Sequence, residues 1–334
     1  MESLSEIKLP LVGLGTCYRA FLKDDPDAGI RKYRGSLRRL FEHELAMARC
    51  EFDALKGYYA TLDMESPFYL VGVTICVVGA LGRGDIQLFD RILKDLRRYP
   101  EVNRHPQARL GREITEAWIR QFLRVKKGHP EWMICGNLIS IPDEWKRQCA
   151  YLSVKGLYLR QDYASAYMAA SLLVNFDVWK DALSAFPTYE RLVCGLASHE
   201  LGRKEEAFYW FRQTAERMCP HGIILPFILL SAWLGPVMDD VIREVSPRAL
   251  EEVRRLAPEF FKNLIRFHNH FTGENLTIDL TPREYYLARQ LSGGYSYKEI
   301  AKKMGISNGR MNNLVCDIYT KLGIHGKSDL AALV

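Results

Sequence analysis

Apolar residues recur at three- and four-residue steps along most of the first 270 positions of this chain. Residues 40–59 illustrate the pattern, with apolar side chains at Leu40, Leu45, Ala48, Phe52, Leu55 and Tyr59. This spacing gathers them on one face of an α-helix, and the strict alternation of a strand is scarce. The pattern predicts an all-α fold, with about a dozen helices ahead of the last sixty residues.

The most apolar stretch, Gly222 to Met238, is almost free of charge. A helix needs roughly 20 apolar residues to cross a bilayer, and this stretch is shorter and holds two prolines. We therefore expect a buried helix followed by a turn, and no membrane partner.

A weak repeat also runs through this helical part. Gly195, Ala207 and Phe211 have the spacing of the core positions of a tetratricopeptide repeat, and Pro220 closes the unit. Leu201-Gly202 recurs as Leu234-Gly235, 33 residues later, close to the roughly 34-residue period of that repeat. The segment resembles a degenerate tetratricopeptide-like domain, although an irregular helical bundle remains an alternative. Such a domain would offer a surface to an unidentified small-molecule, peptide or protein effector.

The last sixty residues carry three consecutive helix signals. Thr281 and Glu284 form a capping box around Pro282, which predicts a helix from Pro282 to about Ser292, ended by Gly293-Gly294. Ser296 and Glu299 repeat the capping box for a short second helix that ends at Gly305. A short, glycine-containing turn between two helices is typical of a helix-turn-helix.

The third helix is predicted from Asn308 to Leu322, capped by Ser307. Its apolar residues share one face: Met311, Leu314, Val315, Ile318 and Leu322. The opposite face carries Gly309, Arg310, Asn312, Asn313, Cys316 and Thr320. Arg can pair with guanine and Asn with adenine in the major groove of DNA.

This tail resembles the LuxR-type (GerE-like) helix-turn-helix family. The matching residues include Leu280, Thr281, Arg283, Glu284, Leu287, Leu291, Gly294, Ser296, Lys298, Glu299, Ile300, Ala301, Ile306, Ser307, Ile318, Lys321, Leu322 and Gly323. The resemblance implies a four-helix DNA-binding domain whose last helix, Lys327 to Leu333, pairs with its copy in a homodimer through Leu330 and Leu333.

The chain departs from the family pattern where DNA would be read. The positions of the usual Lys and His hold Asn312 and Leu314. By position, the base-facing residues are Asn312, Asn313 and Cys316, and the chemistry of its side chain adds Arg310. Phosphate contacts are expected from Lys298, Ser307, Lys321 and Lys327. The preferred DNA sequence cannot be borrowed from the family.

Charge and cysteine content agree with this interpretation. From Thr277 onward the chain has eight Lys and Arg against five Asp and Glu, as suits a partner of phosphates. The eight cysteines include no CxxC pair, so we expect reduced, buried thiols in a cytoplasmic protein. No phosphate-binding loop, zinc-protease or serine-hydrolase motif occurs, so neither an enzyme nor a cofactor is expected.

The predicted organisation is a helical repeat domain over residues 1–267, a linker over 268–276 and a LuxR-type domain over 277–334. The predicted function is a transcription regulator that binds double-stranded DNA and whose helical domain senses an effector. The alternative is an interaction scaffold whose tail no longer reads sequence.

Overall fold

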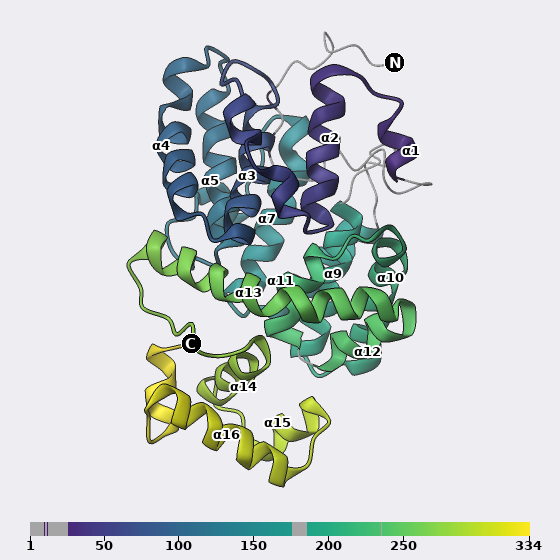
Figure 1. Cartoon of the computed structure of the whole chain (residues 1–334), viewed down its shortest axis with the longest axis vertical. Helices are drawn as coiled ribbons and strands as arrows, with labels where there is room; N and C mark the ends of the chain where they lie inside the picture. Colours follow the sequence, from purple (N-terminus) through teal and green to yellow (C-terminus); the bar gives the residue numbers. More distant parts are fainter. Residues whose placement is uncertain (1–9, 11, 13–25, 176–185, 235) are drawn as a thin grey trace. The chain divides into compact units, whose positions relative to one another are not determined.

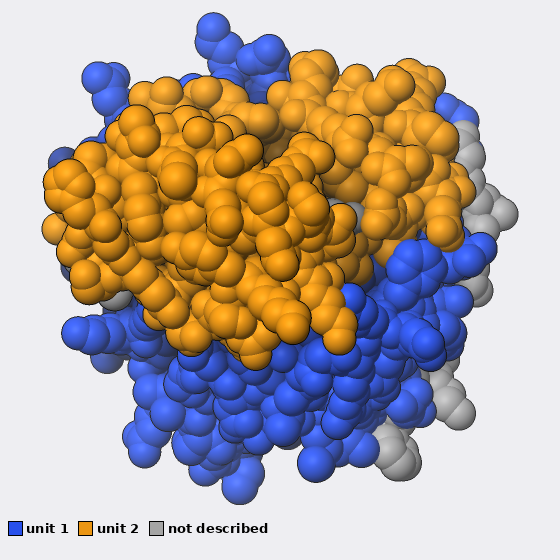
Figure 2. Space-filling model, turned by 90° about the horizontal axis from the view of Figure 1, so that it is seen from below, with its two compact units in different colours: residues 1–217 blue, residues 218–334 orange. Residues whose placement is uncertain are grey.

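The computed structural model describes residues 10, 12, 26–175, 186–234 and 236–334. Every regular element in these ranges is an α-helix or a 3₁₀-helix, so the all-α prediction is confirmed (Figure 1). The chain forms two compact units, residues 1–217 and 218–334, which Figure 2 shows in separate colours.

The first unit begins with a helical core formed by the first third of the chain. Its elements are α1 (Pro26–Ile30), α2 (Gly35–Ala48), η3 (Phe52–Leu55), η4 (Tyr58–Thr61), α3 (Tyr69–Arg83), α4 (Ile86–Val102) and α5 (Ala108–Phe122). Helix α3 is apolar and buried from Tyr69 to Leu81 because α2, α4 and α5 all pack around it (Figure 1). Gly84 ends α3 in the left-handed conformation, and the Asp85 side chain then caps α4 by accepting from the Leu88 amide at 3.0 Å.

The rest of the first unit continues as helices. Its elements are α6 (Glu131–Cys135), α7 (Asp143–Leu159), α8 (Tyr163–Asn175), α9 (Phe186–Glu200) and α10 (Lys204–Met218). A buried ion pair joins α7 to α9: the Arg147 guanidinium donates to both carboxylate oxygens of Glu190, at 3.4 and 3.2 Å. Neither side chain has more than 6% of its surface exposed, so this pair must hold its geometry within the core.

Helices α9 and α10 pack at the three positions that suggested a tetratricopeptide unit. Gly195 and Phe211 lie so close that a Cβ atom on Gly195 would come within 2.5 Å of the phenyl ring. Ala207 and Phe211 are fully buried. The close packing explains the spacing in this one helical pair, while the repeat itself stays a prediction, and Gly235 of its last copy lies outside the described residues.

The second unit combines three further helices with the C-terminal tail. Its elements are η5 (Cys219–His221), α11 (Leu225–Leu234), α12 (Pro236–Val245), α13 (Pro247–Thr272), α14 (Pro282–Ser292), α15 (Tyr297–Met304), α16 (Asn308–Leu322) and η6 (Lys327–Ala332). Helix α11 fills most of the apolar stretch, as predicted, and α12 begins within it at Pro236, whereas Gly235 between them lies outside the described residues. No helix among the described residues is long and apolar enough to cross a membrane.

Helix α14, the first helix of the tail, packs against α11 and α13 as well as against its own domain. The rings of Phe261 in α13 and Tyr285 in α14 meet edge to face, with centroids 4.9 Å apart. The tail is thus joined to α11 and α13 by a packed interface and not only by the chain between them.

Helix α13 runs past residue 267, where the helical repeat domain was predicted to end, and continues to Thr272, where Gly273 caps it in the left-handed conformation. The compact second unit therefore takes in residues that the sequence assigned to a linker and, with α11–α13, to the helical repeat domain. The domain boundaries at residues 267 and 277 stay a prediction.

Five of the described cysteines are buried, as expected, but Cys135 and Cys316 are exposed. Burial raises the pKa of the Cys76 thiol to about 12 and of the Cys149 thiol to about 12, which keeps both unreactive. The expectation of buried thiols is wrong for Cys135, which lies at the end of a five-residue helix, and for Cys316 on α16.

Candidate nucleic-acid interface

The first helix of the tail is fixed by the predicted capping box. The Thr281 hydroxyl accepts from the Glu284 amide at 3.3 Å, and the Glu284 carboxylate accepts from the Thr281 amide at 2.8 Å. Gly294 supplies the left-handed conformation after the helix, with φ of +95°. The helix runs from Pro282 to Ser292 and buries Tyr286, Leu287 and Leu291, as predicted.

The second capping box fixes α15 in the same way. The Ser296 hydroxyl accepts from the Glu299 amide at 3.3 Å, and the carboxylate accepts from the Ser296 amide at 2.8 Å. Gly305 then takes a left-handed conformation, and the Ile306 amide bonds to the Ala301 carbonyl at 3.1 Å. These bonds fix the conformation of the turn between α15 and α16.

Helix α16 follows directly, with Ser307 accepting from the Arg310 amide at 3.3 Å. Met311, Val315 and Ile318 are buried, and they lock one face of the helix against the domain. Leu314 and Leu322 on the same side are half-buried. The predicted bounds, Asn308 to Leu322, are those of the structure.

The opposite face of α16 carries the four residues predicted to face bases. Arg310, Asn312, Asn313 and Cys316 are all exposed, and together they define what we call the reading face. Two amides and a guanidinium can offer forked hydrogen bonds to base edges. Sequence reasoning missed Asp317, which is exposed one turn after Asn313 and could have been found from that spacing. Its carboxylate lies next to Cys316 in the sequence and repels phosphates.

A family model described as "GerE: Bacterial regulatory proteins, luxR family" matches residues 279–334. Residues 279–334 form a LuxR-family helix-turn-helix domain. Such a domain makes the chain a DNA-binding transcription regulator. No curated protein and no solved structure matches the chain.

The four residues expected at DNA phosphates differ in whether other groups of the LuxR-family domain already bind their side chains. Lys298 and Lys327 are exposed, and Ser307 is exposed while its hydroxyl caps α16. Lys321 is held elsewhere: its ammonium donates to Glu284 of α14 at 2.6 Å. A phosphate at Lys321 would have to share that ammonium with the carboxylate.

The Lys321–Glu284 pair ties the end of α16 to the start of α14. Partial burial acts to raise the pKa of Glu284, but hydrogen bonds from Lys321 and Thr281 outweigh it, and the pKa lies below its ordinary value. The Glu284 side chain is 13% exposed and that of Lys321 is 44% exposed. One carboxylate therefore caps a helix and joins two helices of the LuxR-family domain.

One further cation near the turn, Lys303, is engaged within the LuxR-family domain, and one aromatic residue nearby, Tyr297, is exposed. The Lys303 ammonium lies 3.9 Å from the centre of the Tyr295 ring and donates to Gln290 at 3.3 Å. Tyr297, at the start of α15, is 40% exposed. Sequence reasoning gave neither residue a role, and Tyr297 adds an exposed aromatic ring beside the predicted phosphate contact Lys298.

The fourth helix of the LuxR-family domain is a 3₁₀-helix, η6, from Lys327 to Ala332. Leu330, a predicted dimer contact, is fully buried because η6 packs on α14 of the same chain. Leu333 is half-buried and keeps exposed surface. Of the two predicted contacts, only Leu333 can meet a second copy without rearrangement of η6.

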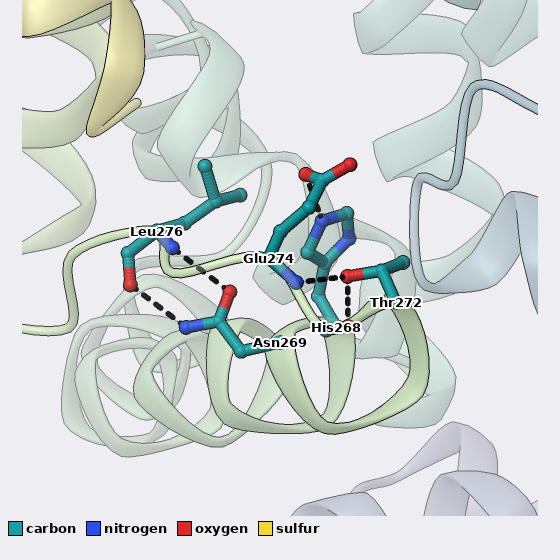
Figure 3. A network of polar contacts seen from close by, with 5 residues as sticks. All are labelled: His268, Asn269, Thr272, Glu274 and Leu276. Atoms are coloured by element: carbon teal, nitrogen blue, oxygen red, sulfur yellow. Dashed lines mark hydrogen bonds and ion pairs between the residues drawn. The ribbon is translucent and has the colours of Figure 1, made fainter.

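A network of side chains secures the segment that enters the LuxR-family domain (Figure 3). The Asn269 side chain donates to the Leu276 carbonyl at 2.8 Å and accepts from the Leu276 amide at 2.9 Å. His268 pairs with Glu274 at 3.0 Å, and Thr272 accepts from the Glu274 amide at 3.1 Å. The segment is thus bound to the end of α13 at Glu274 and Leu276.

Among the described residues, no group of His, Cys, Asp and Glu side chains is arranged to hold a metal ion.

Proposed function

We propose that this chain is a sequence-specific transcription regulator that places α16 in the major groove of double-stranded DNA. The observation that supports this most is the exposed reading face on a helix whose other face is locked by Met311, Val315 and Ile318. A rigid helix with forked donors directed outward is what direct reading of base edges requires.

In this proposal the reading face recognises bases and the surrounding residues hold the backbone. Arg310 pairs with guanine, and Asn312 and Asn313 pair with adenine. Lys298, Ser307 and Lys327 contact phosphates, and Lys321 does so while it stays paired with Glu284. Cys316 supplies a small side chain where the helix comes closest to the groove.

The protein is proposed to bind as a homodimer to a two-fold site, with half-sites about one helical turn apart. This follows from the family resemblance, and Leu333 is the predicted contact that keeps exposed surface. The cytoplasm is the proposed location because bacterial DNA, the partner of this family, lies there.

The helical part of the chain is proposed to sense an effector and to change how the DNA-binding domain is presented. The packing of α14 on α11 and α13, and the network between Asn269 and Leu276, support this proposal. A change in α13 would reach α14 through these contacts.

The test is the double substitution Arg310→Ala with Asn312→Ala. Because a bidentate base contact contributes about 1–3 kcal/mol, we expect the intact protein to lose on the order of 100-fold or more in affinity for its selected site. The matched control is Arg248→Ala with Asn275→Ala, which removes the same two residue types at exposed positions outside the LuxR-family domain.

A salt titration on the same proteins separates the contribution of phosphate contacts from that of base contacts. The logarithm of the affinity should fall with that of the salt concentration, with a slope of roughly −0.9 per phosphate contact. If the double variant binds DNA as tightly as the control variant does, the reading face does not read DNA. The chain would then be the interaction scaffold that the sequence left open.

A further inference from the structure

A cavity of about 770 Å³ lies in the first unit, between α5 and the segment from Gly128 to Ser140. Its size falls within the roughly 300–1,000 Å³ of sites that take small molecules. One wall is the face of α5 that carries Arg112, Glu116 and Arg120, a helical turn apart from one another. The facing wall includes His129 and Trp132.

The lining carries both signs of charge. Arg112 and Glu116 approach only to 3.6 Å, and each keeps about a third of its side chain exposed, at 36% and 32%. Such a long, solvated pair is weak and can open to admit a ligand between its partners. Glu131 on the facing wall is exposed and adds a second carboxylate.

Two lining side chains each have a shielded polar atom that makes no hydrogen bond. These are the Arg112 Nε–H donor, which lies 3.6 Å from the Glu116 carboxylate, and the His129 Nδ1 atom. His129 Nε2 lies 2.7 Å from the Val125 carbonyl, which can only accept, so Nε2 carries the proton. Burial lowers the pKa of His129 and favours the neutral ring, so Nδ1 is a free acceptor.

A donor and an acceptor that make no hydrogen bond in one cavity suit a ligand that offers an acceptor to Arg112 and a donor to His129. The acceptor on the ligand must suit a guanidinium, which favours a carboxylate. The donor must suit an imidazole lone pair and neighbouring carboxylates, which favours an ammonium.

Trp132 gives the cavity a fixed apolar wall. Its indole N–H donates to Glu113 at 2.7 Å, which orients the ring while leaving Glu116 and Glu131 for a ligand. Cys135, beside it on α6, is an exposed thiol that also lines the cavity.

We propose that this cavity binds a zwitterion of the amino acid or short-peptide class. The ligand's carboxylate meets Arg112 and Arg120, and its ammonium meets Glu116 and His129. This inference rests on the proposed sensing role of the helical part and names the effector class for it.

The test offers the full-length chain an equimolar random tripeptide library with free termini. The same library with acetylated amino and amidated carboxyl ends is the matched probe. Peptides retained with the protein on ultrafiltration are quantified by mass spectrometry. We expect retention of free-terminus peptides and a loss of roughly tenfold or more when the ends are blocked.

Two further comparisons localise the binding. Arg112→Gln should lose retention roughly tenfold, whereas Arg109→Gln, exposed on the same helix outside the cavity, should not change it. Bound peptide should slow alkylation of the wild-type Cys135 thiol and leave that of Cys316 unchanged, since Cys316 lies on α16, far along the chain and outside the cavity lining.

Equal retention of blocked and free libraries, no retention of either, or unchanged Cys135 alkylation overturns the proposal. These measurements need no DNA. A protein that selects DNA and retains no peptide would refute the ligand class alone, and the proposed DNA-binding function would stand.

Discussion

Asn269→Ala tests whether the connection between α13 and the LuxR-family domain is as firm as its hydrogen bonds indicate. The substitution removes both bonds to the main chain of Leu276, of 2.8 and 2.9 Å. It leaves α13 intact, because alanine favours a helix at least as well as asparagine does. The effect is therefore confined to the segment that the side chain holds (Figure 3).

The expected magnitude follows from the two bonds. A typical hydrogen bond contributes a net 0.5–1.5 kcal/mol or so, so the pair contributes about 1–3 kcal/mol to keeping the segment closed. Since roughly 1.4 kcal/mol is a factor of ten, the Leu276 amide should exchange its hydrogen about 5- to 150-fold faster in the variant.

Hydrogen exchange measured residue by residue is the direct assay. The control is Asn275→Ala, an exposed neighbour of the same type. Amides at the centre of α3, in the first unit, should exchange at the wild-type rate in both variants. An Asn269→Ala protein whose Leu276 amide exchanges at the wild-type rate would refute the claim that this side chain holds the segment.

Three other predictions concern stability. Gly195→Ala places a methyl 2.5 Å from a phenyl ring of α10 and should lower the free energy of unfolding by about 1–3 kcal/mol in urea. Gly309→Ala, whose methyl group has no atom within 4 Å, should not lower the free energy of unfolding. Equal losses of this free energy in the two variants would contradict the packing argument. Glu190→Ala removes the carboxylate that the buried Arg147 guanidinium binds through two hydrogen bonds, and should cost about 3–5 kcal/mol in the same assay; a loss below about 1 kcal/mol would show that the pair is dispensable. Folding lowers the pKa of Glu284 below its ordinary value of 4.5. The ionised carboxylate therefore contributes fully to the free energy of unfolding above pH 4.5, and this contribution is lost as the pH falls below 4.5. Glu284→Gln should therefore flatten the acid side of a stability–pH profile, and an unchanged profile would argue against the pairing.

The tail could be predicted closely because its signals are local. Capping boxes at Thr281 and Ser296 and a cap at Ser307 act within three residues, so the sequence alone specifies where α14, α15 and α16 begin. The one-sided spacing of apolar residues on α16 likewise determines which side chains are left exposed.

What the sequence could not provide depends on contacts between distant residues. Lys321 meets Glu284 37 positions away, so a lysine expected at phosphate is partly neutralised. Leu330 is buried because η6 folds onto α14, which no local pattern indicates. The cavity of the first unit is likewise formed where α6 and the loops on either side of it, within residues 128–140, lie against α5.

The end of α13 shows how a local signal can mislead. The linker predicted over residues 268–276 includes Asn269 and Thr272, whose side chains can compete with helical hydrogen bonds. In the structure the Thr272 hydroxyl bonds back to the His268 carbonyl at 2.7 Å, and Asn269 bonds forward to Leu276. Both polar side chains are satisfied in a helix, and Gly273 marks its end.

Selection of bound sequences from a random pool of double-stranded DNA tests the central claim most directly. The account predicts that the full-length protein enriches one motif, with two-fold related half-sites about one helical turn apart. It also predicts that the protein with Arg310→Ala and Asn312→Ala loses preference at particular bases of that motif. A pool that stays random after repeated selection at physiological salt would contradict the account.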